Sequence, residues 1–209
     1  MSGISGILNH KSKNENIIFD LLNKINSNLR HRGPDNTGIW NDKKNFCFLG
    51  HTRLSILDLS VNGNQPMLDQ DKRCVISYNG EIYNFKELRE VLKQSGVQFK
   101  SDTDTEVLLE GYKLFGKSFI QHLDGMFAFA IYEIENSKLL IFRDRAGEKP
   151  IYYGYINKNR ESFVFSSQLS SFFYHNNWNG NINQSSLKNF LNMGFIAGDN
   201  SIFDNIKKI

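Results

Sequence analysis

The sequence lacks the features that mark membrane-spanning, secreted and nucleic-acid-binding proteins. None of its apolar runs approaches the length that crosses a bilayer, and no basic stretch followed by an apolar core marks a secretory signal at the N-terminus. Lysines and arginines are interleaved with acidic residues, and the formal net charge is only +3 over 209 residues. We therefore predict no membrane span and no nucleic-acid surface.

Cysteine is scarce, and histidine is scattered. The two cysteines, Cys47 and Cys74, have no C-x-x-C spacing, which argues against a disulfide framework and a zinc site and predicts two reduced thiols inside strands. A cytoplasmic location follows from the same observation. The five histidines are not paired at metal-ligand spacing, and we predict no metal site from them: His10, His31, His51, His122 and His175.

Several common catalytic and nucleotide-binding motifs are also missing. The chain contains no G-x-x-x-x-G-K-[ST], G-x-G-x-x-G, H-E-x-x-H or G-x-S-x-G segment, and no internal repeat. Its length and its apolar content of 40% are those of one ordinary globular domain, predicted over residues 1–209.

The spacing of apolar residues predicts strands and helices in a mixed order. Strands are expected over 2–8, 37–41, 45–51, 73–78, 126–132, 139–143, 151–156 and 162–166, and helices over 16–30, from 85 to near 96, from about 102–105 to 115, over 168–174 and over 184–193. Residues 58–71 are expected to form a loop. Short spacing between the later strands favours antiparallel hairpins.

One strand is apolar on both faces. Phe127 and Phe129 fall on one side, and Ala128 and Ala130 fall on the other. Such a sheet is covered on both sides, which predicts an α+β fold of layered sheets between helices.

Four polar segments lie at predicted strand ends and turns: Arg32–Asp35, His51–Ile56, Tyr78–Glu81 and Ser101–Glu106. Taken singly, such segments have ordinary structural explanations. Arg53 suits a surface ion pair, and Asn79-Gly80 is typical of a hairpin turn. Asp or Thr at the start of the helix near 102–105 suits its N-cap, and N-capping alone would explain Asp102 or Asp104. Together with the small residues of the N-terminus, these segments match one protein family.

The chain resembles the glutamine amidotransferase domain of the asparagine synthetase group, which belongs to the N-terminal-nucleophile hydrolases. The resemblance is carried by Arg32–Asp35 with Gly38, Leu49–Ile56, Gln65–Met67, Tyr78–Asn84, Asp104–Leu109, Asp124–Ala130, and Arg143–Arg145 with Gly147 and Lys149-Pro150. It implies a four-layer αββα sandwich of two mainly antiparallel sheets.

The resemblance also implies a set of roles. After removal of Met1, the side chain of residue 2 attacks the amide carbon of glutamine, and the new α-amine acts as base. The Asn79 side chain and the Gly80 backbone N–H hold the oxyanion, and Arg53 binds the substrate α-carboxylate. Glu81 and Asp104 face the α-ammonium group. Backbone groups of Leu54, Ser55, Ile56 and Leu57 complete the wall, and Arg32–Asp35 belongs to a loop near the site.

The sequence departs from the family pattern at the nucleophile, because the family carries cysteine where this chain has Ser2. A serine hydroxyl is a weaker nucleophile than a thiol near neutral pH, so we expect a large loss of glutaminase rate. Three explanations stay open: an engineered trap for glutamine, a natural ammonia-dependent synthetase, and a slow serine nucleophile.

Three functions therefore compete. The first is a glutaminase domain supplying ammonia to an asparagine synthetase-like enzyme that amidates aspartate or a similar carboxylate. The second is a catalytically silent glutamine-binding or scaffold domain, and the third is a serine-type amide hydrolase acting on another substrate.

We expect no cofactor in this domain, whereas ATP and Mg²⁺ are expected in a C-terminal synthetase domain, whose Ser-Gly-Gly-x-Asp motif is absent here. The tail Ser201–Ile209 ends without a stop signal, so we expect the N-terminal part of a longer protein. The resemblance also suggests a homodimer.

Overall fold

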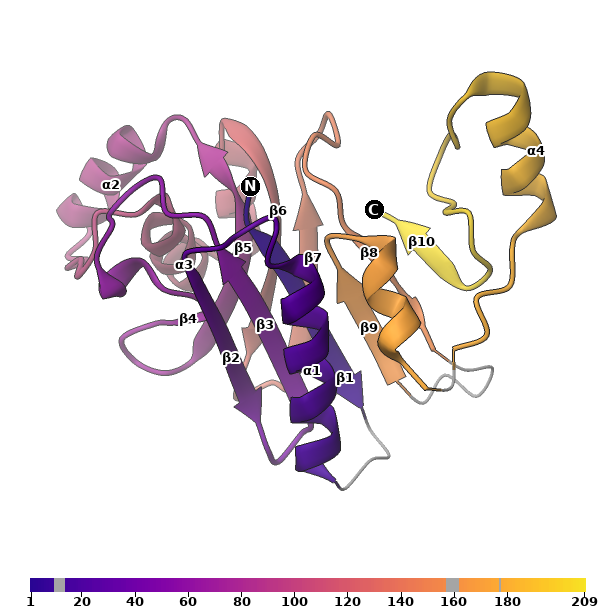
Figure 1. Ribbon diagram of the computed structural model, residues 1–209. Helices are drawn as coiled ribbons and strands as arrows, with labels where there is room; N and C mark the ends of the chain where they lie inside the picture. The colour runs from indigo at the N-terminus through magenta and orange to yellow at the C-terminus, as the bar shows by residue number, and fades with distance from the viewer. Residues whose placement is uncertain (10–13, 157–161, 177) are drawn as a thin grey trace.

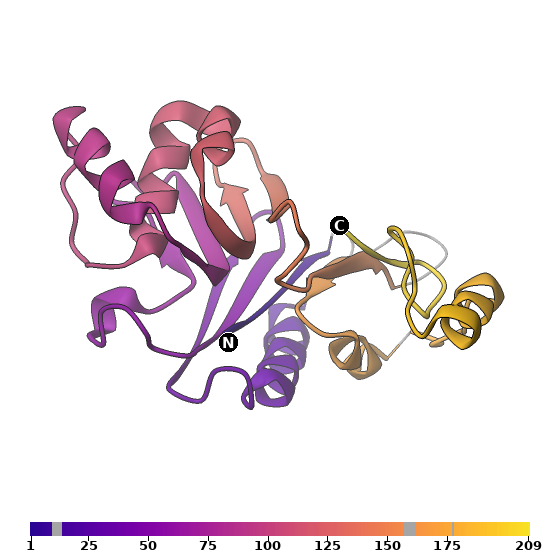
Figure 2. The same cartoon turned by 90° about the horizontal axis from the view of Figure 1, so that it is seen from above.

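Two antiparallel β-sheets lie face to face at the centre of the computed structural model, which describes residues 1–9, 14–156, 162–176 and 178–209 (Figures 1 and 2). The six-stranded sheet has the order β10-β8-β9-β1-β3-β2, and the four-stranded sheet has the order β4-β5-β6-β7. Every pairing between the named strands is antiparallel, and for the later strands this was expected from their short connections.

The strands are β1 (Gly3–Asn9), β2 (Asn36–Asp42), β3 (Cys47–Arg53), β4 (Met67–Leu68), β5 (Cys74–Ile82), β6 (Gly125–Glu133), β7 (Lys138–Arg143), β8 (Tyr152–Tyr155), β9 (Ser162–Ser166) and β10 (Ile206–Lys208). The α-helices are α1 (Glu15–Leu29), α2 (Phe85–Gln94), α3 (Asp104–Phe115) and α4 (Gln184–Met193). Three 3₁₀ segments are η1 (Val61–Gly63), η2 (Gly116–His122) and η3 (Leu169–Tyr174).

Helices cover the outer face of each sheet, which gives the predicted four-layer αββα arrangement (Figures 1 and 2). Leu22 and Leu29 of α1 pack with Phe48 of the six-stranded sheet. Leu108 of α3 packs with Phe129 of the four-stranded sheet. The apolar faces of α1 and α3 therefore each form an outer core with one of the sheets.

A third core lies between the two sheets. Ile4 of β1, Leu49 of β3, and Val75 of β5 meet there with Ala128 and Ala130 of β6. The two-faced strand of the sequence analysis is thus confirmed: its phenylalanines face the helices, and its alanines face the other sheet. β1 lies inside its sheet, between β3 and β9.

Two local predictions were wrong, and one was right in place but not in helix type. The helix expected over 168–174 is present as the 3₁₀ segment η3. Residues 58–71 are not only loop, because they contain η1 and the short strand β4. Asn79-Gly80 is not a turn, since β5 continues through both residues to Ile82. Partner strands override local turn propensity at this position.

None of the helices in the described part of the chain combines the length and the apolar character needed to cross a membrane.

Candidate active site

Ser2 lies immediately before β1 and is held from two directions. The backbone N–H of Leu54 donates a hydrogen bond to Ser2 Oγ at 3.2 Å, and Arg32 Nε donates to the Ser2 carbonyl at 2.9 Å. A Cβ on the next residue, Gly3, would lie 2.6 Å from Thr52 Oγ1, so a larger side chain there would push the strand away. The N-terminus is therefore docked against β3.

The loop Arg32–Asp35 braces this docking. Gly33 packs so closely on β3 that a Cβ would lie 2.2 Å from the Thr52 carbonyl oxygen. Asp35 accepts a hydrogen bond from Ser55 N at 2.7 Å, and its own N–H donates to Arg53 O at 3.0 Å. The loop predicted to lie near the site thus positions both Ser2 and the end of β3.

A pocket with about 370 Å³ of empty space opens at Ser2. Eight predicted site residues line it: Ser2, Arg53, Leu54, Ile56, Leu57, Gly80, Glu81 and Asp104. Five further lining residues had no predicted role: Gly63, Gln65, Tyr78, Thr103 and Thr105. Ser55 and Asn79 do not line the pocket; Ser55 instead bonds to Asp35, as described above.

Asn79 lies in β5 opposite Ala128, and its side chain carries an unsatisfied donor. Residues alternate along a strand, so Asn79 shares the face of Val75 and Ser77, which meets the other sheet. Among the residues that the structure describes, Asn79 Nδ2 is buried without a hydrogen-bond partner. Buried donors are almost always paired, so an unpaired one next to a pocket is available to an incoming acceptor. At Gly80, a Cβ would lie 2.4 Å from the Met126 carbonyl oxygen, which explains the glycine.

Arg53 forms one wall of the pocket, and its guanidinium is enclosed by the loop that follows it. Nη1 donates to Ser60 O at 2.8 Å and to Asn64 Oδ1 at 2.9 Å. Nη2 donates to Leu57 O and Asp58 O. The side chain is buried, and the surface ion pair considered above is not what holds it. The loop Leu57–Asn64 therefore decides where this cation lies.

Carboxylates stand on another wall. Asp104, the first residue of α3, accepts from Tyr78 Oη at 2.6 Å and from Ile82 N at 3.0 Å. Burial raises the pKa of Asp104, and burial together with the Asp104 charge raises the pKa of Glu81. The helix N-cap is Thr103, whose side chain accepts from Glu106 N, so neither Asp102 nor Asp104 is the cap.

Two cations lie around the N-terminal amine. Burial, followed by the charges of Arg32 and Lys149, lowers the pKa of the Met1 ammonium group, and Glu81 opposes this shift. Lys149 is itself buried, and its charge also acts on Glu81. This shift belongs to the Met1 amine, one residue before the Ser2 amine that would act as base after Met1 is removed.

The other titratable groups follow their ordinary structural interpretations. Cys47 and Cys74 are free and buried in strands, and burial raises the pKa of both thiols, to about 11 for Cys74. His51 is fully buried, its Nε2 lies 2.9 Å from Tyr78 O, and burial lowers its pKa to about 4. Within the described residues, no group of three or more His, Cys, Asp or Glu side chains could hold a metal ion.

Sequence reasoning missed residues that position other side chains of the pocket. Gln65 Oε1 accepts a hydrogen bond from the Tyr78 N–H at 2.7 Å, and Gln65 Nε2 donates one to Thr105 Oγ1 at 3.3 Å. Gln65 therefore joins three segments of the pocket. Gly63 leaves space for the arginine, because a Cβ would lie 2.1 Å from Arg53 Nη2. Gln65 and Tyr78 stood inside family motifs, whereas no local signal singled out Gly63.

Comparison with known proteins gives the same picture. The family described as "Glutamine amidotransferase domain" matches residues 1–209. The chain belongs to this family.

Its relatives include longer proteins. A putative asparagine synthetase [glutamine-hydrolyzing] 2 of Methanocaldococcus jannaschii is 37% identical over all of this chain, which spans 42% of that protein. Asparagine synthetase [glutamine-hydrolyzing] 1 of Bacillus subtilis is 35% identical over all of this chain, which spans 32% of it. The chain thus spans less than half the length of these relatives.

A solved structure shows the same fold. The glutamine phosphoribosylpyrophosphate amidotransferase of B. subtilis, complexed with ADP and GMP, superposes with a TM-score of 0.68 at 20% identity. The match covers 82% of this chain and 43% of that one. The glutamine amidotransferase domain described here therefore has the N-terminal-nucleophile amidotransferase fold expected from its sequence.

Proposed function

We propose that this domain binds glutamine and hydrolyses it slowly to glutamate and ammonia, with Ser2 as the nucleophile. The observation that carries the proposal is the distribution of charge around Ser2 Oγ. One pocket contains a buried cation, Arg53, and two carboxylates, Asp104 and Glu81. A free amino acid presents one carboxylate and one ammonium group, and this set of charges complements both.

The chemistry follows from the positions of these groups. Once Met1 is removed, the Ser2 α-amine takes the hydroxyl proton as Oγ attacks the amide carbon of glutamine. The negative charge that develops on the amide oxygen is received by Asn79 Nδ2, the buried donor that has no partner. The amine then returns the proton to the departing nitrogen, ammonia leaves, and water hydrolyses the Ser2 ester to glutamate.

The serine makes this a slow enzyme. A thiol is partly ionised near neutral pH and intrinsically more nucleophilic, whereas a hydroxyl must lose its proton during attack. Leu54 N–H, which donates to Ser2 Oγ, favours the deprotonated oxygen as the proton leaves. The site therefore supports attack by oxygen, at a rate well below that of sulfur.

The whole protein, by the same proposal, is an asparagine synthetase-like ligase. Both relatives named above are called glutamine-hydrolysing asparagine synthetases, and each is longer than this chain. Ammonia released here would pass to a C-terminal domain that uses ATP and Mg²⁺ to amidate aspartate or a similar carboxylate. Two free cysteines fit a cytoplasmic protein. The homodimer and the single-domain boundary stay predictions.

A glutaminase assay on the parent protein and on the Ser2→Cys variant tests the proposal. We expect slow glutamate release from the parent and a rise of at least about a hundredfold in the variant, since the pocket is otherwise complete. Intact mass should show that Met1 has been removed. The proposal is refuted if Ser2→Cys releases no glutamate from glutamine after Met1 removal.

A silent glutamine-binding domain is the second candidate, and Ser2 itself favours it. In that case calorimetry on the parent would detect glutamine binding although no glutamate forms. Absence of heat at millimolar glutamine would exclude this candidate. Release of ammonia from another amide, but not from glutamine, would instead favour the serine-type hydrolase of different specificity.

A further inference from the structure

The two charged walls of the pocket are tied to each other outside it. One wall is Arg53 with the loop Leu57–Asn64, which places four hydrogen-bond acceptors around the guanidinium. The other wall is the start of α3, where Thr103, Asp104 and Thr105 line the pocket. These walls are distant in sequence, so a specific contact has to decide how far apart they stand.

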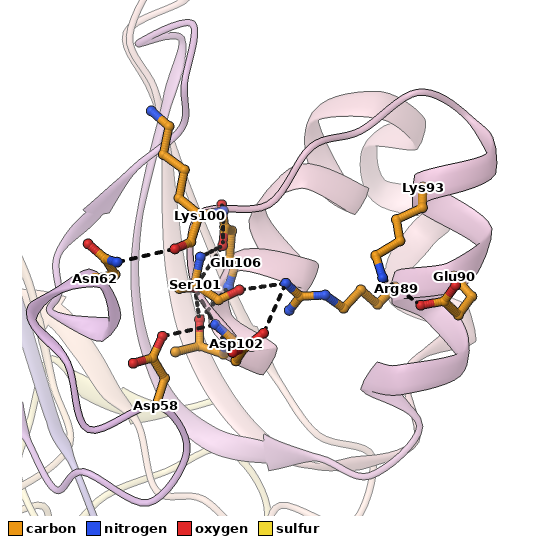
Figure 3. A network of polar contacts seen from close by, with 10 residues as sticks. Asp58, Asn62, Arg89, Glu90, Lys93, Lys100, Ser101, Asp102 and Glu106 are labelled. Atoms are coloured by element: carbon orange, nitrogen blue, oxygen red, sulfur yellow. Dashed lines mark hydrogen bonds and ion pairs between the residues drawn. The ribbon is translucent and has the colours of Figure 1, made fainter.

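Two hydrogen bonds join the first wall to residues 100–102, the segment that leads directly into the second wall (Figure 3). Asp58 Oδ2 accepts from Asp102 N at 2.9 Å, and Asn62 Nδ2 donates to Lys100 O at 3.2 Å. We call this pair of bonds the cross-tie. Asp58 also supplies one of the carbonyls that hold Arg53, so the same residue contacts the first wall and the segment that leads into the second. Both cross-tie bonds lie at the surface, beside the pocket rather than inside it.

The far side of the cross-tie is anchored on α2 and α3 (Figure 3). Arg89 donates to Ser101 O at 2.6 Å and pairs with Asp102 Oδ1 at 3.3 Å, while its guanidinium lies 4.3 Å from the centre of the Phe99 ring. Glu106 accepts from the backbone N–H groups of Lys100 and Ser101. Residues 100–102 are thus held firmly in place, so loosening the cross-tie should move the Leu57–Asn64 loop instead.

We infer that Asp58, Asn62 and Arg89 are positioning residues that set the separation between Arg53 and Asp104, and hence the affinity for glutamine. The inference rests on the proposed function, because it assigns those two side chains to opposite ends of one amino acid. None of the three positioning residues touches Ser2 or lines the pocket. Loosening the cross-tie should therefore weaken substrate binding and leave the chemical step intact.

Asn62→Ala is the first test, because Asn62 is exposed and its side chain reaches Lys100 O without filling a core. Loss of one hydrogen bond of this kind shifts the equilibrium between the held and the released position of the Leu57–Asn64 loop by about two- to tenfold. We expect the Kd for glutamine, measured by calorimetry on the parent chain, to rise by that factor. In the Ser2→Cys background, KM should rise equally and kcat should change less than about twofold.

Arg89→Lys is the second test, because it keeps the positive charge and loses the planar fork that reaches Ser101 and Asp102 together. The same rise in Kd is expected. Lys93→Ala is the matched control: Lys93 lies on the same helix and pairs with exposed Glu90 at 2.8 Å, away from the cross-tie (Figure 3). This control should bind glutamine like the parent, and thermal unfolding of each variant separates positioning from misfolding.

The outcomes distinguish the two proposals. If the parent binds glutamine and both Asn62→Ala and Arg89→Lys bind it equally well, the positioning role is wrong and the proposed function stands. A fall in kcat at unchanged KM would also overturn the positioning role. If the parent does not bind glutamine and Ser2→Cys does not hydrolyse it, the proposed function fails and the positioning role fails with it.

Discussion

Replacing Asn79 by alanine should lower kcat and leave the free energy of unfolding and the Kd for glutamine nearly unchanged. Asn79 Nδ2 is a buried donor without a partner in the described part of the chain, and it lies on the strand face that meets β1 and β3. In the proposed reaction it acquires a partner only when the amide oxygen of glutamine becomes negative. The variant therefore removes an interaction that exists in the transition state and not in the free protein.

The expected magnitudes follow from that difference. Loss of one oxyanion donor costs about 3–4 kcal/mol of transition-state stabilisation, which lowers kcat by about 10²–10³. Truncation leaves a small cavity, but it also removes an unpaired buried donor that costs about 1–3 kcal/mol in the folded state. These effects oppose each other, so the free energy of unfolding should change by less than about 1 kcal/mol. The Kd for glutamine should stay within about threefold.

Ser77→Ala is the matched control, because Ser77 lies two residues earlier on the same strand face and its Oγ donates to Gly50 O at 2.9 Å. This variant loses a bond present in the folded protein, so its free energy of unfolding should fall by about 1 kcal/mol while kcat is preserved. Glutaminase kinetics in the Ser2→Cys background and urea denaturation measure both quantities. A kcat for Asn79→Ala within threefold of the parent would refute the assignment of the oxyanion donor.

Three further outcomes are expected. Gly63→Ala should displace the Arg53 guanidinium, since the new Cβ would lie 2.1 Å from Nη2, and should raise the Kd for glutamine at least about tenfold in calorimetry; an unchanged Kd would contradict the role of Arg53. Glutamine binding should weaken as the pH falls, beginning above the ordinary carboxyl range, because burial raises the pKa of both Asp104 and Glu81 and each must be ionised to attract an ammonium group; an affinity that stays constant from pH 7 to pH 5 would argue against both. Burial lowers the pKa of His51 from 6.5 to about 4, so in this window the unfolded chain binds a proton that the folded chain does not. Stability present above pH 6.5 should therefore be lost towards pH 4, by about 3 kcal/mol from His51, and urea denaturation of His51→Gln should show a correspondingly shallower pH dependence.

Periodic elements were predicted well, because their pattern and their packing agree. The helix expected over 16–30 is α1, and it buries Leu22 and Leu29, which are two turns apart and so share one face. The antiparallel pairing of the later strands followed from their short connections. Such elements can be predicted from their own local sequence, without knowing which distant residues they contact.

The error at Asn79-Gly80 has the opposite cause. The pair has a strong intrinsic preference for a turn, and only its pairing with Ala128 and Phe127 of β6 holds it extended. Gly80 is required there because the neighbouring backbone is close, not because the chain reverses. No property of residues 79 and 80 themselves distinguishes the two cases.

The sequence by itself determined the family, the two-faced strand of the sandwich and most side chains of the pocket, because these depend on residue types in a fixed order. It also exposed the single departure, Ser2, at the nucleophile. Tertiary structure alone decided how Arg53 is enclosed by the Leu57–Asn64 loop, how Gln65 joins three segments, and how Asp58 and Asn62 tie two walls together. Those contacts join residues far apart in the chain, and only folding brings their donors and acceptors within hydrogen-bond distance.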